Sequence, residues 1–147
     1  MLETIRTAWG WIGLVPAEVV AANAFGNLIV RAADNVYWRI CPEEWSCEPI
    51  AENADEYAKL TQDDEFREDW EMKPLAEAAR EKFGQLSVGR CYCLKIPAVL
   101  GGEYDADNFG AISLDELIAF SGDMANQIKD LPEGAEIELK VLHTLES

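Results

Sequence analysis

Residues 28–40 decide the fold class, and they read Leu-Ile-Val-Arg-Ala-Ala-Asp-Asn-Val-Tyr-Trp-Arg-Ile. Two runs rich in β-branched and aromatic residues, 28–31 and 36–40, flank four turn-prone residues, which is the pattern of a β-hairpin. Pro42 ends the second run, and residues 45–50 can add a third short strand that Pro49 keeps at an edge. The sequence therefore predicts an antiparallel sheet at this point of the chain.

The segment before the hairpin favours a helix. Leu2, Ile5, Trp9 and Ile12 follow one another at intervals of 3, 4 and 3 residues, the spacing of one helix face. An apolar run followed by small residues also resembles a signal peptide, but Pro16 interrupts it. No run of 18 apolar residues occurs, so we expect no transmembrane helix and a cytoplasmic protein.

The middle of the chain predicts three short helices. Asn53 and Asp63 are suited to cap the first two, because a side-chain oxygen at that position accepts a hydrogen bond from the helix backbone. Pro74 suits the first turn of the third helix, and Gly84 suits its end.

The last third of the chain returns to strands around one long helix. Residues 90–96 predict a strand, and Gly101-Gly102 predict a tight turn or a close backbone approach. Ser113 begins the clearest helix, and residues 137–142 alternate as in a final strand. We therefore predict an α+β fold, a mostly antiparallel sheet with helices packed on it, in a single compact domain over residues 1–147.

Charge narrows the range of partners. The chain carries 28 acidic against 12 basic side chains, a formal net charge of −16. This excess repels nucleic acid and anionic membranes and attracts basic proteins, although an acidic surface can also serve solubility alone. Residues 43–81 hold 14 acidic and 4 basic side chains. We expect a basic protein partner and no direct contact with nucleic acid or a membrane.

Residues 105–116 are the one stretch that fits a metal-binding pattern. Asp105, Asp107 and Glu116 match ligand positions of a calcium loop, but Phe109 stands where an oxygen ligand is required. A turn followed by a helix cap explains the same residues. Calcium binding is therefore the minor alternative, and we expect no cofactor.

The four cysteines do not have the spacing of a zinc site. Cys91 and Cys93 share one face of a predicted strand, so a disulfide between them would be strained. His143, the sole histidine, is predicted to be a strand residue rather than a general base. We expect reduced, mostly buried thiols at these two positions and at Cys41 and Cys47.

The sequence contains no pattern typical of a catalytic site. Its aromatic side chains beside acidic ones indicate a protein-binding surface instead. Nucleophile elbows, phosphate-binding glycine loops and paired metal-binding histidines do not occur in the sequence. Trp38, Trp45 and Trp70 are flanked by carboxylates, as in an interface with aromatic anchors and a charged rim, and we expect one of the three to be exposed. The predicted contact residues are Glu43, Glu44, Trp45, Asp64, Glu65, Glu68, Asp69 and Trp70.

Several short motifs resemble one family. Phe-Gly-Asn-Leu at 25–28 and Val-Tyr-Trp-Arg-Ile-Cys-Pro-Glu at 36–43 resemble the GAD-like region of type VI secretion immunity proteins. Residues 101–108, 116–123 and 127–134 resemble the C-terminal domain of those proteins. The order of segments is also similar to the Smi1/Knr4-like immunity architecture. The resemblance divides the chain into a GAD-like half, about 1–85, and a C-terminal half, about 86–147.

The resemblance implies a cytoplasmic immunity protein that binds and occludes a cognate antibacterial toxin, in the best-known cases a DNase. No binding residue carries over from the family, because such interfaces diverge with the toxin. Two other classes remain open at this point. One is a regulatory module that binds calcium or a small ligand, and the other is a hydrolase with paired carboxylates. The sequence does not indicate an oligomeric state.

Overall fold

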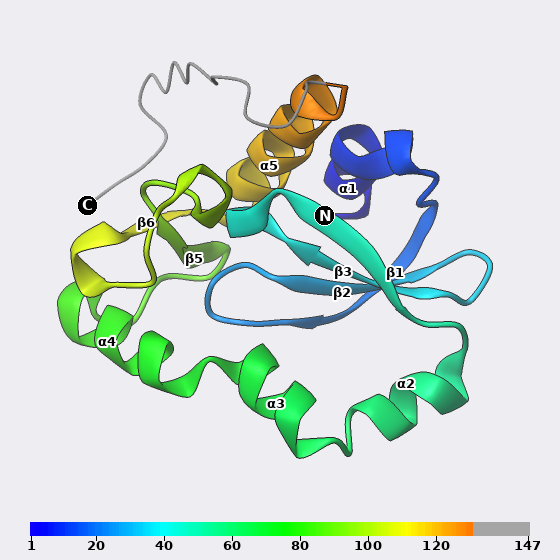
Figure 1. The fold of residues 1–147 in the computed structure, drawn as a ribbon, viewed down its shortest axis with the longest axis horizontal. Helices are drawn as coiled ribbons and strands as arrows, with labels where there is room; N and C mark the ends of the chain where they lie inside the picture. Colours follow the sequence, from blue (N-terminus) through cyan, green and yellow to red (C-terminus); the bar gives the residue numbers. More distant parts are fainter. Residues whose placement is uncertain (131–147) are drawn as a thin grey trace.

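A computed structural model describes residues 1–130 and arranges them around a four-stranded antiparallel sheet (Figure 1). Each strand pairs with the next along the chain, in the order β1 (Pro16–Ala22), β2 (Leu28–Ala32), β3 (Tyr37–Cys41) and β4 (Ser46–Ala51). The hairpin β2–β3 confirms the reading of residues 28–40, and its turn contains Asn35 at φ 70°. Pro49 lies in the edge strand β4, as predicted. Strand β1 was not predicted.

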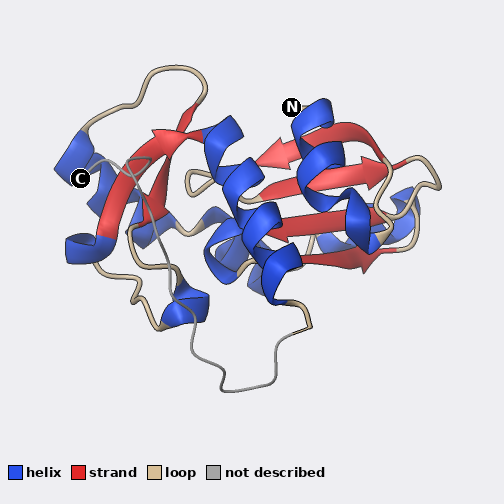
Figure 2. Cartoon of the chain, turned by 90° about the horizontal axis from the view of Figure 1, so that it is seen from above, coloured by secondary structure: helices blue, strands red, loops and turns tan. Residues whose placement is uncertain are grey.

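Two helices cover one face of this sheet. They are α1 (Leu2–Trp9), continued by the 3₁₀ turn η1 (Gly10–Ile12), and α5 (Leu114–Ile128). Ile5 and Trp9 of α1 and Ile118 of α5 pack against Leu28 and Val30 of β2, so the predicted N-terminal helix is confirmed. Figure 2 shows the helices lying over the strands, which run side by side beneath them.

The opposite face carries α2 (Ala54–Leu60) and α3 (Asp64–Glu71). Tyr57 of α2 stacks on Tyr37 of β3, with the ring centroids 4.4 Å apart. Phe66 and Trp70 of α3 pack against the same cluster. The sheet is therefore the middle layer between two helical layers, with α1 and α5 above it and α2 and α3 below it in Figure 1.

A second, two-stranded sheet stands beside this arrangement (Figure 2). It consists of β5 (Arg90–Leu94) and β6 (Phe109–Ser113), and α4 (Lys73–Phe83) packs on one of its faces. Phe25, from the β1–β2 loop, meets Phe109 edge to face at 5.2 Å and links the two sheets. The strands thus form two separate sheets where the sequence suggested one.

The helix boundaries follow the predicted caps. Asn53, Asp63 and Ser113 each accept a hydrogen bond from the backbone nitrogen three residues later. Pro74 lies in the first turn of α4, and Gly84 ends that helix at φ 73°. Three further 3₁₀ turns complete the described chain: η2 (Pro42–Glu44), η3 (Ala98–Leu100) and η4 (Ala106–Asn108).

The outcome is an α+β fold in one compact domain, as predicted. The predicted turn at 132–134, the predicted strand at 137–142 and His143 lie outside the described residues. Between residues 1 and 130, no helix combines the length and the apolar character needed to cross a membrane.

Candidate functional site

An acidic groove lies on the α3 side of the central sheet. It has a volume of about 390 Å³, and residues of β3 and β4 line it together with residues of α2, α3 and the loop before η4. We call it the sheet groove. Its lining residues are Arg39, Cys41, Glu44, Ser46, Glu48, Ile50, Leu60, Phe66, Asp69, Met72 and Tyr104. Three carboxylates and one guanidinium share this lining, so the groove carries a negative charge.

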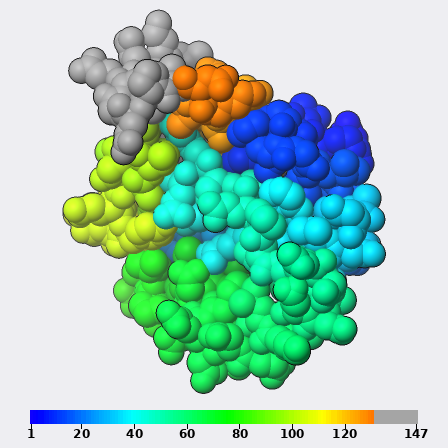
Figure 3. All heavy atoms as spheres, turned by 45° about the vertical axis from the view of Figure 1, so that its right-hand side comes forward, coloured from blue at the N-terminus to red at the C-terminus, as the bar shows by residue number. Residues whose placement is uncertain are grey.

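Helix α3 extends the acidic surface beyond the groove. Asp64, Glu65 and Glu68 are exposed, and Asp69 of the same helix lines the groove. The helix begins here because Asp63 caps it, and the acids of its first turn interact favourably with the helix dipole. Figure 3 shows α3 and its neighbouring helices (green) forming one outer face of the molecule. The structure therefore brings the predicted acids of α3 next to Glu44 in one surface region.

Arg39 anchors α3 to the sheet from within the groove. Its Nη1 donates a hydrogen bond to Asp69 Oδ2 at 2.6 Å, and its guanidinium carbon lies 5.2 Å from the centre of the Trp70 ring. Its Nε and Nη2 donate to Asn27 Oδ1 at 3.2 and 3.0 Å. Arg39 thus holds one wall of the groove to the floor through a fork of directed bonds.

A buried polar network lies behind the groove. Asn27, which is fully buried, donates from Nδ2 to Glu43 Oε1 at 2.9 Å, and Tyr104 donates its hydroxyl to Glu43 Oε2 at 3.1 Å. Burial and, to a lesser degree, the charge of Glu43 raise the pKa of Tyr104. Burial likewise raises the pKa of the neighbouring Cys41 thiol, with Glu43 adding to the effect. Both groups therefore stay protonated donors at neutral pH.

Two predicted contact residues do not belong to the surface. Glu43 is 6% exposed and its carboxylate is occupied by Asn27 and Tyr104, while Trp45 is 7% exposed and packs in the core with Phe120. Trp45 ends η2 in a left-handed conformation at φ 50°. Trp38 and Trp70 are half-buried, so none of the three tryptophans is exposed, contrary to the prediction.

Sequence reasoning missed several residues of the groove. Arg39, Glu48 and Tyr104 line it, and none of them was among the predicted contact residues. Arg39 and Glu48 lie in the strands predicted at 36–40 and 45–50, and the structure pairs them directly across β3 and β4. Tyr104 meets Glu43 across 61 residues of sequence, and no local pattern indicates that contact.

The stretch that matched a calcium loop has another structure. Residues 109–113 form strand β6, which separates Asp105 and Asp107, at the N-cap and within η4, from Glu116 in α5. Asp105 accepts a hydrogen bond from the backbone of Asp107, and Ser113 caps α5. In the described part of the chain, no three Asp, Glu, His or Cys side chains are grouped so that they could hold a metal ion.

All four cysteines are free thiols, and three of them are buried. Cys91 and Cys93 share one face of β5 and pack against Ile112 and α5, as their spacing predicts. Burial raises the pKa of each of these two thiols to about 12. Such thiols are poor nucleophiles at neutral pH, which fits a packing role.

Comparison with known protein families identifies the family of the chain. The model of the family described as "T6SS immunity protein Tdi1, C-terminal" matches residues 51–125, about half of the 147 residues. None of the curated proteins gives a match. The match spans α2, α3, α4, the β5–β6 sheet and most of α5, and it confirms the resemblance to type VI secretion immunity proteins. The chain belongs to the Tdi1 family of type VI secretion immunity proteins, whose C-terminal domain it carries.

Proposed function

We propose that this protein acts in the cytoplasm as an immunity protein that binds a cognate antibacterial toxin and neutralises it by occlusion, without turnover and without a cofactor. Membership of the Tdi1 family supports the immunity role. The observation that carries the mode of action is the sheet groove, an acidic hollow continued by the exposed acids of α3. Such a surface favours tight binding of a basic protein.

The chemistry of the groove suits a toxin that itself binds nucleic acid. A nuclease needs a cationic cleft for phosphates, and a surface of carboxylates can compete for the same lysines and arginines. The chain has a net charge of −16, so long-range attraction would bring such a toxin to it quickly. We therefore propose a basic toxin, with a nuclease as the favoured class.

The proposed contact surface keeps most of the predicted residues and drops two. It contains the exposed acids of α3 as the charged rim and Glu44, Glu48 and Asp69 as the groove acids. Trp70, which is half-buried and lies against Arg39, supplies an aromatic ring beside the groove. Glu43 and Trp45 act from the interior, by positioning Tyr104 and η2. The rim sets the rate of encounter, and the partly desolvated groove provides the lasting contacts.

The first test is co-expression with the product of the neighbouring toxin gene, followed by kinetics of the purified pair. We expect growth to be rescued, a one-to-one complex, and an association rate that falls as salt is added. Growth that is not rescued, with a toxin shown to be folded and active, contradicts the proposal.

The second test asks whether the toxin contacts the acidic surface of α3. Asp64→Asn, Glu65→Gln and Glu68→Gln together keep the shape of α3 and remove three charges, while Asp69 is retained because it holds Arg39. We expect association to slow by about tenfold at low salt and its salt dependence to weaken. An unchanged salt dependence contradicts this placement. The matched control removes three exposed charges from α4 and η4, by Glu77→Gln, Glu81→Gln and Asp107→Asn.

A further inference from the structure

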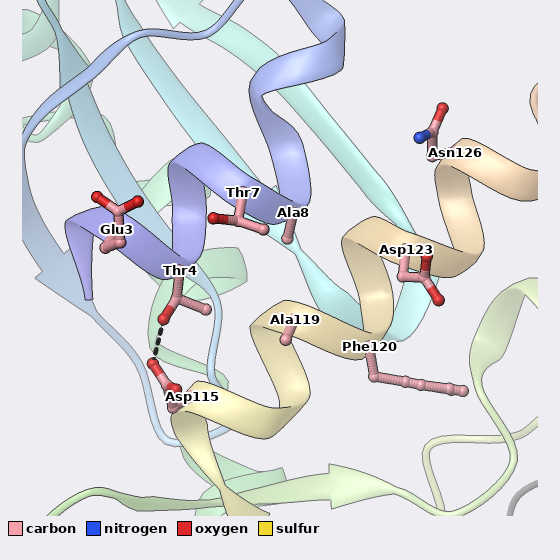
Figure 4. A pocket seen from close by; sticks show the side chains of 9 residues that line it. All are labelled: Glu3, Thr4, Thr7, Ala8, Asp115, Ala119, Phe120, Asp123 and Asn126. Atoms are coloured by element: carbon pink, nitrogen blue, oxygen red, sulfur yellow. Dashed lines mark hydrogen bonds between the residues drawn. The ribbon is translucent and has the colours of Figure 1, made fainter.

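A second groove lies on the opposite side of the sheet, between α1 and α5 (Figure 4). We call it the helix groove. Its volume is about 600 Å³, larger than that of the sheet groove. Its lining residues are Glu3, Thr4, Thr7, Ala8, Asp115, Ala119, Phe120, Asp123 and Asn126.

The groove is a fixed feature of the way the two helices pack. Gly122 brings them together, because a Cβ atom there would lie 2.5 Å from the carbonyl oxygen of Ala8. Ala8 and Ala119 have only methyl side chains, so the space beside this contact stays unfilled (Figure 4). A hydrogen bond from the Thr4 hydroxyl to Asp115 Oδ1, 2.5 Å long, ties the helices together at one end of the groove. The hollow is therefore built into a rigid contact.

The lining of the helix groove is acidic. Glu3, Asp115 and Asp123 contribute three carboxylates, and no lysine or arginine is among the described residues that line it. Glu3 is paired with Arg6 of the same helix, so Asp115 and Asp123 supply the carboxylates that no described cation neutralises. Asp115 and Asp123 each accept one side-chain hydrogen bond, from Thr4 and Gln127. A carboxylate has about four acceptor sites, so both retain capacity for a cationic ligand. Together with the aromatic ring of Phe120, this lining complements the head and the stem of a lysine or arginine side chain.

The helix groove and the sheet groove lie on either side of two adjacent residues, Glu44 and the buried Trp45. Phe120 of the helix groove meets Trp45 edge to face, with the ring centroids 6.3 Å apart. Glu44, the residue before Trp45, lines the sheet groove. The two acidic grooves therefore flank the Glu44–Trp45 segment, which precedes the edge strand β4.

We propose that the helix groove receives a lysine- or arginine-bearing segment of the toxin, and that the toxin grips the chain around the Glu44–Trp45 segment by occupying both grooves. The proposal rests on the immunity function proposed above. It explains why two acidic hollows face opposite sides of one edge of the sheet. A partner held at both would also cover the exposed edge of β4, which would otherwise offer unpaired backbone groups to other chains.

Two independent variants of the full chain test this proposal, measured with the purified toxin. Asp115→Asn with Asp123→Asn removes two groove charges and keeps oxygen acceptors for Thr4 and Gln127. Ala119→Leu fills the hollow from an exposed helix position without changing charge. We expect each variant to weaken toxin binding by about tenfold while its thermal unfolding stays that of the wild type. If Ala119→Leu does not fold, the variant Asp115→Asn with Asp123→Asn tests the proposal by itself.

The outcomes separate this proposal from the one it rests on. The matched control for the two groove charges is Glu77→Gln with Glu81→Gln, which removes two exposed charges from α4. Weakened binding by the groove variants and unchanged binding by this control support a toxin that occupies both grooves. Wild-type affinity in the groove variants, with binding still weakened by the α3 variant, overturns the second contact and leaves the immunity function standing. A wild-type chain that does not bind the toxin overturns both.

Discussion

Replacing Tyr104 by Phe tests the buried network behind the sheet groove. The change removes one hydroxyl and keeps the ring, so it deletes the hydrogen bond to Glu43 Oε2 with little change in packing. A hydrogen bond to a charged group contributes about 1.5–3 kcal/mol to stability. The 3.1 Å length of this bond and the 38% exposure of Tyr104 place it at the lower end. We expect the free energy of unfolding to fall by about 1.5 kcal/mol.

Urea unfolding at pH 7 measures this loss, and thermal unfolding should show a midpoint lower by about 3–6 °C. Tyr57→Phe is the matched control, since that ring stacks on Tyr37 and no hydrogen bond of its hydroxyl is described. The control should change stability by less than about 0.5 kcal/mol. A double-mutant cycle with Glu43→Gln then isolates the pair. A Tyr104→Phe effect no larger than that of the control would refute the role given to the network.

Two further predictions concern the interior. Gly102→Ala should destabilise the fold by about 3 kcal/mol or more, because the new Cβ would lie 1.7 Å from the carbonyl oxygen of Ile96. The matched variant Gly101→Ala has open space for its Cβ, but the alanine must adopt φ 92°, so it should cost about 1–2 kcal/mol. Equal losses in urea unfolding would contradict this reasoning. In reducing buffer, the thiols of Cys91 and Cys93 should make the fold sensitive to alkali. The thiols of the unfolded chain lose their protons above pH 9, whereas those of the folded chain hold them to about pH 12. Each thiol therefore lowers the free energy of unfolding by about 1.4 kcal/mol per pH unit between these limits. The double Ala variant should lose this slope between pH 9 and 10.5, and parallel curves for variant and wild type would sink the idea.

The fold could be predicted where local pattern and tertiary environment agree. The hairpin from 28 to 40, the caps of α2, α3 and α5 and the apolar face of α5 all follow from residues within one or two turns. Strand β1 escaped because its sequence, Pro-Ala-Glu-Val-Val-Ala-Ala, contains three alanines and a glutamate, which have weak strand preference. Its pairing with β2 supplies what its own residues lack.

The negative charge of the candidate site could be predicted from the sequence, but which of its side chains are buried could not. Acidic side chains on a capped, polar helix such as α3 are expected to face solvent, so their exposure follows from the sequence. The burial of Trp45 depends on its contact with Phe120 of α5, which is 75 residues away in sequence. The burial of Glu43 depends on Asn27 and Tyr104, which are distant in sequence. Neither effect has a local signature.

The residues that hold the fold differ from the residues that we propose to meet the toxin. Asp64, Glu65 and Glu68 are exposed, and none of their side chains has a described tie to the interior, whereas Asp69, their neighbour, is bound by Arg39. Substitutions at the three outward positions should change stability by only about 0.5 kcal/mol each. An inhibitor built in this way can follow a toxin that drifts, because the partner it recognises can change in small steps while the framework stays intact. Rapid divergence of its specificity is then a property of the architecture itself.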